Sequence, residues 1–170
     1  MNNNLIITIG REYGTGGREI GQKLALRLGV PFYDRELITR AAKKTGFDEK
    51  LFEQLDKRAT NSFLYSLTMF GSVGLNGMSL TDQLYLAQSN IIREMAEDSS
   101  CVIVGRCADH VLRDFPNKFD FFIHGSIEDR VKRVQTCGDY VIEGKTPEAA
   151  LEKMDKQRST YYNYYTGKVW

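Results

Sequence analysis

The sequence predicts a three-layer α/β fold, in which helices cover both faces of a mostly parallel sheet. Four short apolar stretches alternate with stretches of helical periodicity along the chain. Strands that are apolar throughout are typical of parallel sheets covered on both faces. A glycine-rich loop joins the first apolar stretch to the first helical one. The 170 residues suit a single domain.

The first third of the chain predicts two strands and two helices. The apolar stretch LIITI at 5–9 predicts a buried strand, and the glycines within 10–17 predict a loop. Apolar residues recur at helical spacing over 18–29, a stretch that ends in a glycine stop signal. The stretch VPFYD at 30–34 predicts a second strand, and a helix with its own glycine stop follows at 35–46.

The middle of the chain predicts three helices and a strand around one ambiguous segment. A short helix is expected at 48–58, whereas 59–79 mixes glycines with scattered apolar residues and is compatible with an apolar loop or a hairpin. Strong helical periodicity follows at 81–98. The stretch CVIVG at 101–105 predicts a third buried strand, and a short helix is expected at 108–114.

The last third predicts one strand and two helices. The stretch KFDFFIHG at 118–125 predicts the fourth strand. A helix is expected at 126–136, because Ser126 stands three residues before Asp129 in the manner of a capping box. A long helix is expected at 146–165, where a proline suits the first helical position.

Ligands of such sheets bind outside the carboxyl ends of the strands, so the polar residues after each strand are the first candidates for a site. These residues lie within Arg11 to Arg18, Asp34 to Arg40, Arg106 to Asp109, and Ser126 to Arg133.

The glycine loop is placed as a phosphate-binding loop would be, between a buried strand and a helix. A helix N-terminus favours anions, and glycines let the backbone approach them closely. However, the P-loop pattern GxxxxGK[ST] is not matched. Gly17 takes the place of the lysine, Arg18 and Glu19 follow it, and the hydroxyl that would help to hold Mg²⁺ just after the glycines is absent. A plain turn between strand and helix is the simplest alternative.

A dinucleotide site is a second alternative. Gly10, Gly14 and Gly16 match the GxxxGxG loop of short-chain dehydrogenases, and Asp34 ends the second strand where a ribose-binding acid would lie. The segment YYNYYTGK even contains the Y-x-x-x-K of that family, although such a pattern arises readily by chance among so many tyrosines.

Four segments together resemble cytidylate kinase, and more closely the cytidylate kinase-like proteins of bacteria. They are ITIGREYGTGGREIG, FYDRELITRAA, IVGRCADHVL, and HGSIEDRVKRV with the later DKQRSTYYNYYTGK. The resemblance spans most of the chain. It implies a P-loop NTPase fold of the nucleoside monophosphate kinase type over 1–170, with an acceptor-binding insert at about 46–80 and a lid at about 126–150. A strand that follows the lid in cytidylate kinases is expected to be missing.

The resemblance also implies the site residues. Asp34 and Arg40 match an acid and a monophosphate-binding arginine of the kinases, and Asp34 would also orient Mg²⁺ through water. The expected phosphate-binding residues are Gly14, Thr15, Gly16, Gly17 and Arg18. The expected acceptor-binding residues are Asp34, Arg40, Arg106, Asp109 and Arg158. Arg18, Arg130 and Arg133 are expected to be catalytic, the last two from the lid.

The implied function is transfer of the γ-phosphoryl group of ATP, with Mg²⁺, to a nucleoside monophosphate such as CMP or dCMP. A non-catalytic nucleotide-binding module with a degenerate loop is the alternative. A net charge of +1 favours a small-molecule nucleotide over nucleic acid, and the absence of a long apolar run argues against a membrane. Three cysteines without metal-ligand spacing fit a cytoplasmic protein, and a homo-oligomer is left open.

Overall fold

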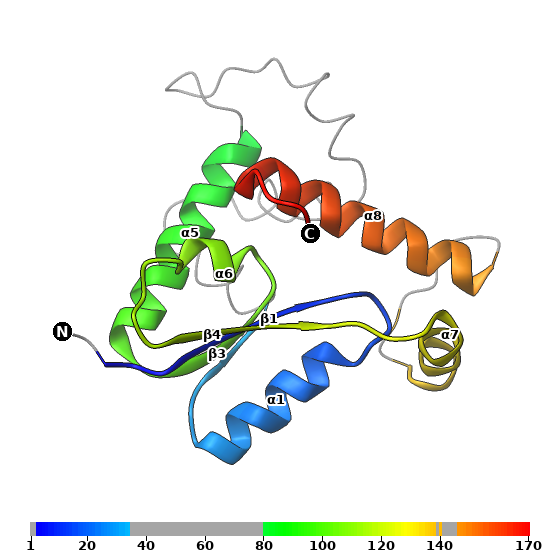
Figure 1. The fold of residues 1–170 in the computed structure, drawn as a ribbon, viewed down its shortest axis with the longest axis horizontal. Helices are drawn as coiled ribbons and strands as arrows, with labels where there is room; N and C mark the ends of the chain where they lie inside the picture. Colours follow the sequence, from blue (N-terminus) through cyan, green and yellow to red (C-terminus); the bar gives the residue numbers. More distant parts are fainter. Residues whose placement is uncertain (1–2, 35–79, 139, 141–145) are drawn as a thin grey trace.

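In the computed structural model, residues 3–34, 80–138, 140 and 146–170 are described, and they form a parallel four-stranded sheet with helices on both faces (Figure 1). The strand order is β2-β3-β1-β4, and all three strand pairs are parallel. The strands are β1 (Ile6–Arg11), β2 (Phe32–Tyr33), β3 (Cys101–Val104) and β4 (Lys118–Ile123). The predicted α/β class with a parallel sheet is confirmed.

Five helices lie in the described part of the chain. They are α1 (Gly17–Leu28), α5 (Leu80–Asp98), α6 (Ala108–Val111), α7 (Ile127–Thr136) and α8 (Pro147–Thr166). Each matches a predicted helix, and Gly29 ends α1 with a φ of 65° as expected of a glycine stop. The helices predicted at 35–46 and 48–58, the segment 59–79 and Arg40 lie outside the described residues, as does all but the last residue of the predicted insert at 46–80.

The core has one cluster on each face of the sheet. On one face, Ile6 of β1 and Ile103 of β3 pack with Ile92 of α5 and Leu112 after α6. On the other face, alternate residues of the same strands, including Ile9 and Val104, pack against α1. Figure 1 shows α1 on one side of the sheet and α5, α6 and α8 on the other. These layers leave the carboxyl ends of the strands facing α7 and α8.

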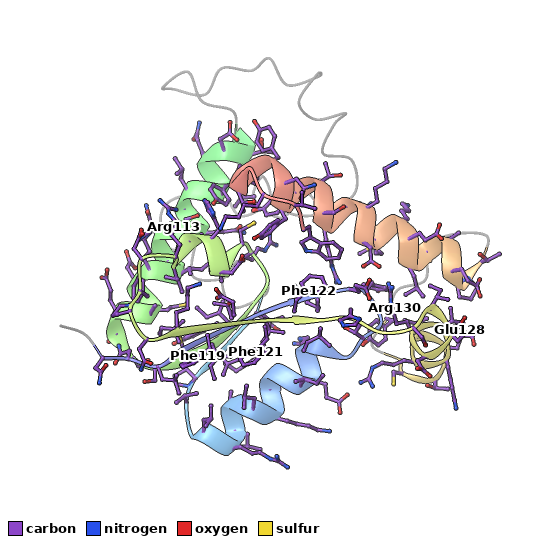
Figure 2. The ribbon with its side chains drawn as sticks, viewed as in Figure 1. Arg113, Phe119, Phe121, Phe122, Glu128 and Arg130 are labelled. Carbon is purple, nitrogen blue, oxygen red and sulfur yellow. The ribbon has the colours of Figure 1, made fainter. Side chains whose placement is uncertain are left out.

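The fourth strand is less buried than its apolar sequence predicts. Phe119 and Phe121 are 53% and 51% exposed, since α1 packs on β1, β2 and β3. Phe122 points to the opposite face, toward α8 (Figure 2). Sequence hydrophobicity alone did not reveal that α1 leaves this strand uncovered.

The sheet order separates the two ligand-binding alternatives. In the classic dinucleotide-binding order, the second strand lies next to the first. Here β3 lies between them, because β1 pairs with β3 and β4 whereas β2 pairs only with β3 among the described strands. The chain leaves β1 toward α1 and leaves β3 toward α6, on opposite faces. The crevice between the ends of β1 and β3 is therefore the expected ligand site.

No helix within the described ranges is long and apolar enough to cross a membrane.

Candidate functional site

The glycine loop at the end of β1 has the backbone of an anion site. Gly14 and Gly16 adopt φ values of 83° and 77°, a region that favours glycine. Helix α1 then begins at Gly17, and no side chain caps its N-terminus. The first-turn N–H groups of a helix attract anions, so this end of α1 suits a phosphate group.

Helices α7 and α8 pack against the glycine loop at Gly14. A Cβ atom placed on Gly14 would lie 3.0 Å from Cγ1 of Val134 on α7 and 3.1 Å from Cδ2 of Leu151 on α8. A larger residue at Gly14 would therefore push these helices away. The close contact fixes the position of the loop relative to the predicted lid.

Arg130 of α7 is the centre of a buried ion-pair cluster between the glycine loop and α8. Its Nε donates to the carbonyl of Tyr13 at 2.8 Å, Nη1 lies 3.3 Å from Oε2 of Glu12, and Nη2 pairs with Asp155 of α8. Asp155 also accepts from the Tyr13 N–H at 2.6 Å. The side chain of Arg130 is 9% exposed. In this structure, Arg130 binds the loop backbone.

Arg133 of α7 covers the loop from outside. A Cβ atom on Gly16 would lie 2.7 Å from the guanidinium carbon of Arg133, so the side chain rests on the glycine. Its Nη2 pairs with Glu19 in the first turn of α1, and its Nε donates to the Tyr140 hydroxyl at 3.2 Å. The pKa of Glu19 is lowered chiefly by a hydrogen bond from Lys23, and the second largest cause is the hydrogen bond from Arg133.

Arg18 turns away from the crevice toward the second strand. Its Nε lies 2.7 Å from Oδ2 of Asp34, whose side chain is 8% exposed, while the Arg18 side chain is 52% exposed. The pairing occupies the carboxylate that was expected to orient Mg²⁺. Within the described part of the chain, no group of three or more metal-ligating side chains comes together.

A cavity of about 440 Å³ lies at the carboxyl ends of β1, β3 and β4, under α8. It brings together three of the predicted acceptor-binding residues, Arg106, Asp109 and Arg158. Arg18 and Asp34 do not line it. Of the five predicted acceptor-binding residues, three therefore line the cavity. Asp34 lies beside α1, and Arg40 lies outside the described residues.

The turn after β3 places Arg106 in the cavity wall. Gly105, Arg106 and Cys107 adopt φ values of 80°, 58° and 55°. Two successive non-glycine residues with positive φ store strain, which is common at functional sites. Arg106 donates to Oε1 of Gln88 at 3.4 Å, and its guanidinium carbon lies 6.0 Å from the ring centre of Tyr161. Burial is the main cause that raises the pKa of the Cys107 thiol to about 12, so the thiol stays protonated.

The remaining wall residues are held by α8. The Tyr162 hydroxyl donates to Oδ2 of Asp109 at 2.6 Å, and burial, followed by this hydrogen bond, raises the pKa of Tyr162. Arg158 donates to the carbonyl of Arg11 at 3.2 Å and lies 5.0 Å from the ring centre of Tyr13. Helix α8 thus supplies one wall of the cavity and ties it to the end of β1.

Comparison with known proteins gives the family of the chain. The model of the cytidylate kinase-like family matches residues 6–170. The chain belongs to the cytidylate kinase-like family. An uncharacterized protein from Eubacterium ventriosum has a crystal structure with a TM-score of 0.67 and 30% identity, covering 98% of this chain and 81% of that one.

A second solved structure is similar to this chain in fold. Shikimate kinase from Acinetobacter baumannii, in complex with shikimate, has a TM-score of 0.51 and 14% identity, covering 96% of this chain and 80% of that chain. No curated protein matches the chain significantly. The family and the P-loop kinase fold make this chain a nucleotide kinase-like protein.

Several residues that line the cavity are not among the predicted site residues. Arg11 and Gln157 line the cavity, as does Trp170, whose ring meets Phe122 edge to face with centroids 5.1 Å apart. Arg11 lies in the polar stretch after the first strand, which was the available hint. Trp170 joins the cavity only through the fold, since α8 brings the end of the chain over β4.

The described residues suit the phosphates of ATP better than they suit a bound metal. The end of α1 presents N–H groups, and the guanidinium of Arg133 lies against Gly16 beside them. A phosphate chain fits that chemistry. The carboxylates in and around the loop each pair with an arginine, and they are those of Glu12, Glu19, Asp34 and Asp155. Mg²⁺ would therefore be held chiefly by phosphate oxygens and water.

Proposed function

We propose that this protein transfers the γ-phosphoryl group of ATP to a small phosphorylated acceptor, with CMP and dCMP as the first candidates. The observation that carries the proposal is the cavity at the β1–β3 crevice, where Arg11, Arg106 and Arg158 line the wall beside the glycine loop. Three guanidinium groups around one cavity suit an anionic ligand, because each offers several donors in a plane.

In this proposal, the loop and the cavity serve opposite ends of the reaction. Gly14, Thr15, Gly16 and Gly17 hold the phosphates of ATP through backbone N–H groups. Arg106 and Arg158 hold the acceptor phosphate. The bond between the γ-phosphorus and the bridging oxygen of ATP breaks, and a bond to an acceptor phosphate oxygen forms, so that ADP and CDP leave. Mg²⁺, when bound, neutralises charge on the phosphates.

The lid residues act on the phosphates from the other side. Arg133 already lies on Gly16. When a phosphate binds there, Arg133 would leave Glu19 and bind a phosphate oxygen instead. The hypothesis that Arg130 and Arg18 are catalytic stays a prediction. Arg130 contributes by keeping the Tyr13 segment in place, whereas Arg18 needs to leave Asp34 to reach a phosphate.

A coupled assay of ADP formation tests the proposal. The acceptors tested would be CMP, dCMP, UMP and AMP. Shikimate is included because the structurally similar shikimate kinase was solved in complex with it. We expect turnover with one acceptor class and a loss of turnover in Arg106→Met and Arg158→Met. The matched control is Arg27→Met, an exposed arginine at the other end of α1. Equal rates with and without every acceptor would overturn the proposal.

A non-catalytic nucleotide-binding module is the second candidate. The observation that favours it is the contact of Arg133 with Gly16, held by Glu19, in a loop whose lysine position is a glycine. Titration calorimetry with ATP, CMP and NADH separates the candidates. Binding of ATP or CMP without turnover supports the module, and binding of NADH alone would support neither candidate.

A further inference from the structure

Two positions of the glycine loop are exchanged relative to the P-loop pattern. When GxxxxGK is set on Gly16 as its second glycine, the lysine position falls on Gly17 and the first glycine position falls on Arg11. The loop therefore lacks a long cationic side chain at position 17, where the pattern has lysine. It has one at position 11, where the pattern has glycine.

The side chain of Arg11 occupies the space in which a side chain at position 17 would begin. A Cβ atom placed on Gly17 would lie 2.8 Å from Cβ and 3.0 Å from Cγ of Arg11. Both distances are shorter than a normal contact between carbon atoms. The stem of Arg11 thus fills the volume where a side chain at position 17 would begin, and Gly17 leaves room for it.

The guanidinium of Arg11 then reaches across the crevice to the end of β3. A Cβ atom on Gly105 would collide with Nη1 of Arg11, so the guanidinium lies against the Cα of that glycine. Arg11 lines the cavity together with Arg106 and Arg158, and its carbonyl accepts from Arg158 at 3.2 Å. Its charge lies between the glycine loop and the acceptor cavity.

The other arginines near the loop have different positions. Arg18 pairs with Asp34 on the side of β2, Arg133 covers Gly16 from α7, and Arg130 binds the Tyr13 carbonyl. None of these three lines the cavity. Arg158 lines the cavity from α8. Arg11 both contacts Gly17 at the start of α1 and lines the cavity.

We propose that Arg11 is the phosphate-binding cation of this site and takes the role that lysine has in P-loops. It would hold phosphate oxygens at the point where the loop meets the cavity. A guanidinium binds two phosphate oxygens in one plane, which suits a group lying between a donor and an acceptor. This inference rests on the proposed function.

Calorimetry with inorganic tripolyphosphate tests the role of Arg11 without a nucleobase or turnover. Arg11→Met keeps an aliphatic stem against Gly17 and removes the charge, whereas Arg11→Lys restores a positive charge. We expect Arg11→Met to weaken tripolyphosphate binding about 10- to 100-fold, the effect of losing hydrogen bonds from a charged group. Arg11→Lys should regain part of the affinity, and the control Arg27→Met should bind as the wild type does.

Three results of the binding experiment would overturn the inference. They are wild-type affinity in Arg11→Met, an Arg11→Lys variant no better than Arg11→Met, and no tripolyphosphate binding by the wild type. Thermal unfolding of each variant identifies a folding defect, and Arg11→Gln serves if Arg11→Met does not fold. A wild type and an Arg11→Met that phosphorylate an acceptor equally fast would refute the role of Arg11 while leaving the proposed function intact. A wild type without turnover or nucleotide binding would refute the proposed function.

Discussion

Replacing Asp155 with alanine should release the glycine loop from α8. One carboxylate oxygen accepts from the Tyr13 N–H at 2.6 Å, and the other pairs with the guanidinium of Arg130. Arg130 in turn donates to the Tyr13 carbonyl at 2.8 Å. The substitution therefore leaves a buried guanidinium with Glu12 as its remaining carboxylate partner, and it removes the acceptor of a loop N–H.

The size of the effect follows from burial. The side chains of Arg130 and Asp155 are 9% and 17% exposed. Removing one partner of a buried ion pair costs about 3–5 kcal/mol, and the remaining contact with Glu12 places this case at about 3 kcal/mol. For a chain of this length, 1 kcal/mol lowers the melting temperature by about 2–4 °C. We expect a decrease of about 6–12 °C.

Differential scanning calorimetry measures this decrease directly. Asp114→Ala is the matched control, because that side chain is 70% exposed and should change the melting temperature little. Asp155→Asn should fall between the two, since it keeps an acceptor for the Tyr13 N–H but loses the charge. A decrease in Asp155→Ala no larger than that in Asp114→Ala would show that the ion pair does not hold the loop.

Four further predictions concern the cavity wall and the cysteines. Gly105→Ala should destabilise the protein by about 1–3 kcal/mol in urea unfolding, because φ is 80° and the new Cβ would meet a guanidinium; an unchanged midpoint would contradict the described turn. Tyr162→Phe should cost about 1–2 kcal/mol through the lost hydrogen bond to Asp109, and wild-type stability would show that the bond has no net value. Because burial raises the Cys107 pKa to about 12, above its unfolded value, the native state retains a proton that the unfolded state loses above about pH 9. The free energy of unfolding should therefore fall from pH 9 to pH 12, and less steeply in Cys107→Ala; equal slopes would exclude this thiol as the cause. In the folded protein at pH 8, a thiol reagent should modify the partly exposed Cys137 well before Cys107.

The strands and helices of the described region follow from local sequence patterns. The apolar run at β1 and the helical periodicity of α5 each depend on neighbours within a few residues, so sequence patterns reveal them. The capping role of Ser126 is confirmed as well, since its hydroxyl accepts from the Asp129 N–H at 3.1 Å. Such features are fixed by residues close together in the chain.

The side-chain partners at the site depend on contacts between distant segments. Arg130 resembles a lid cation in sequence, yet it bonds to Tyr13, 117 residues away. Asp34 matches a metal-orienting acid, yet it pairs with Arg18 across a gap of 16 residues. The position of Arg11 against Gly105 requires β3 to lie beside β1, and the strand order is set by packing of the whole sheet.

A crystal structure of the protein with a non-hydrolysable ATP analogue, Mg²⁺ and CMP tests the central claim most directly. We predict that the triphosphate lies over Gly14 to Gly17, with the terminal phosphate within about 3 Å of the Arg11 guanidinium. CMP should occupy the cavity between Arg106 and Arg158. A triphosphate bound away from the loop, or bound on it with Arg11 still pointing away from the terminal phosphate, would contradict the account.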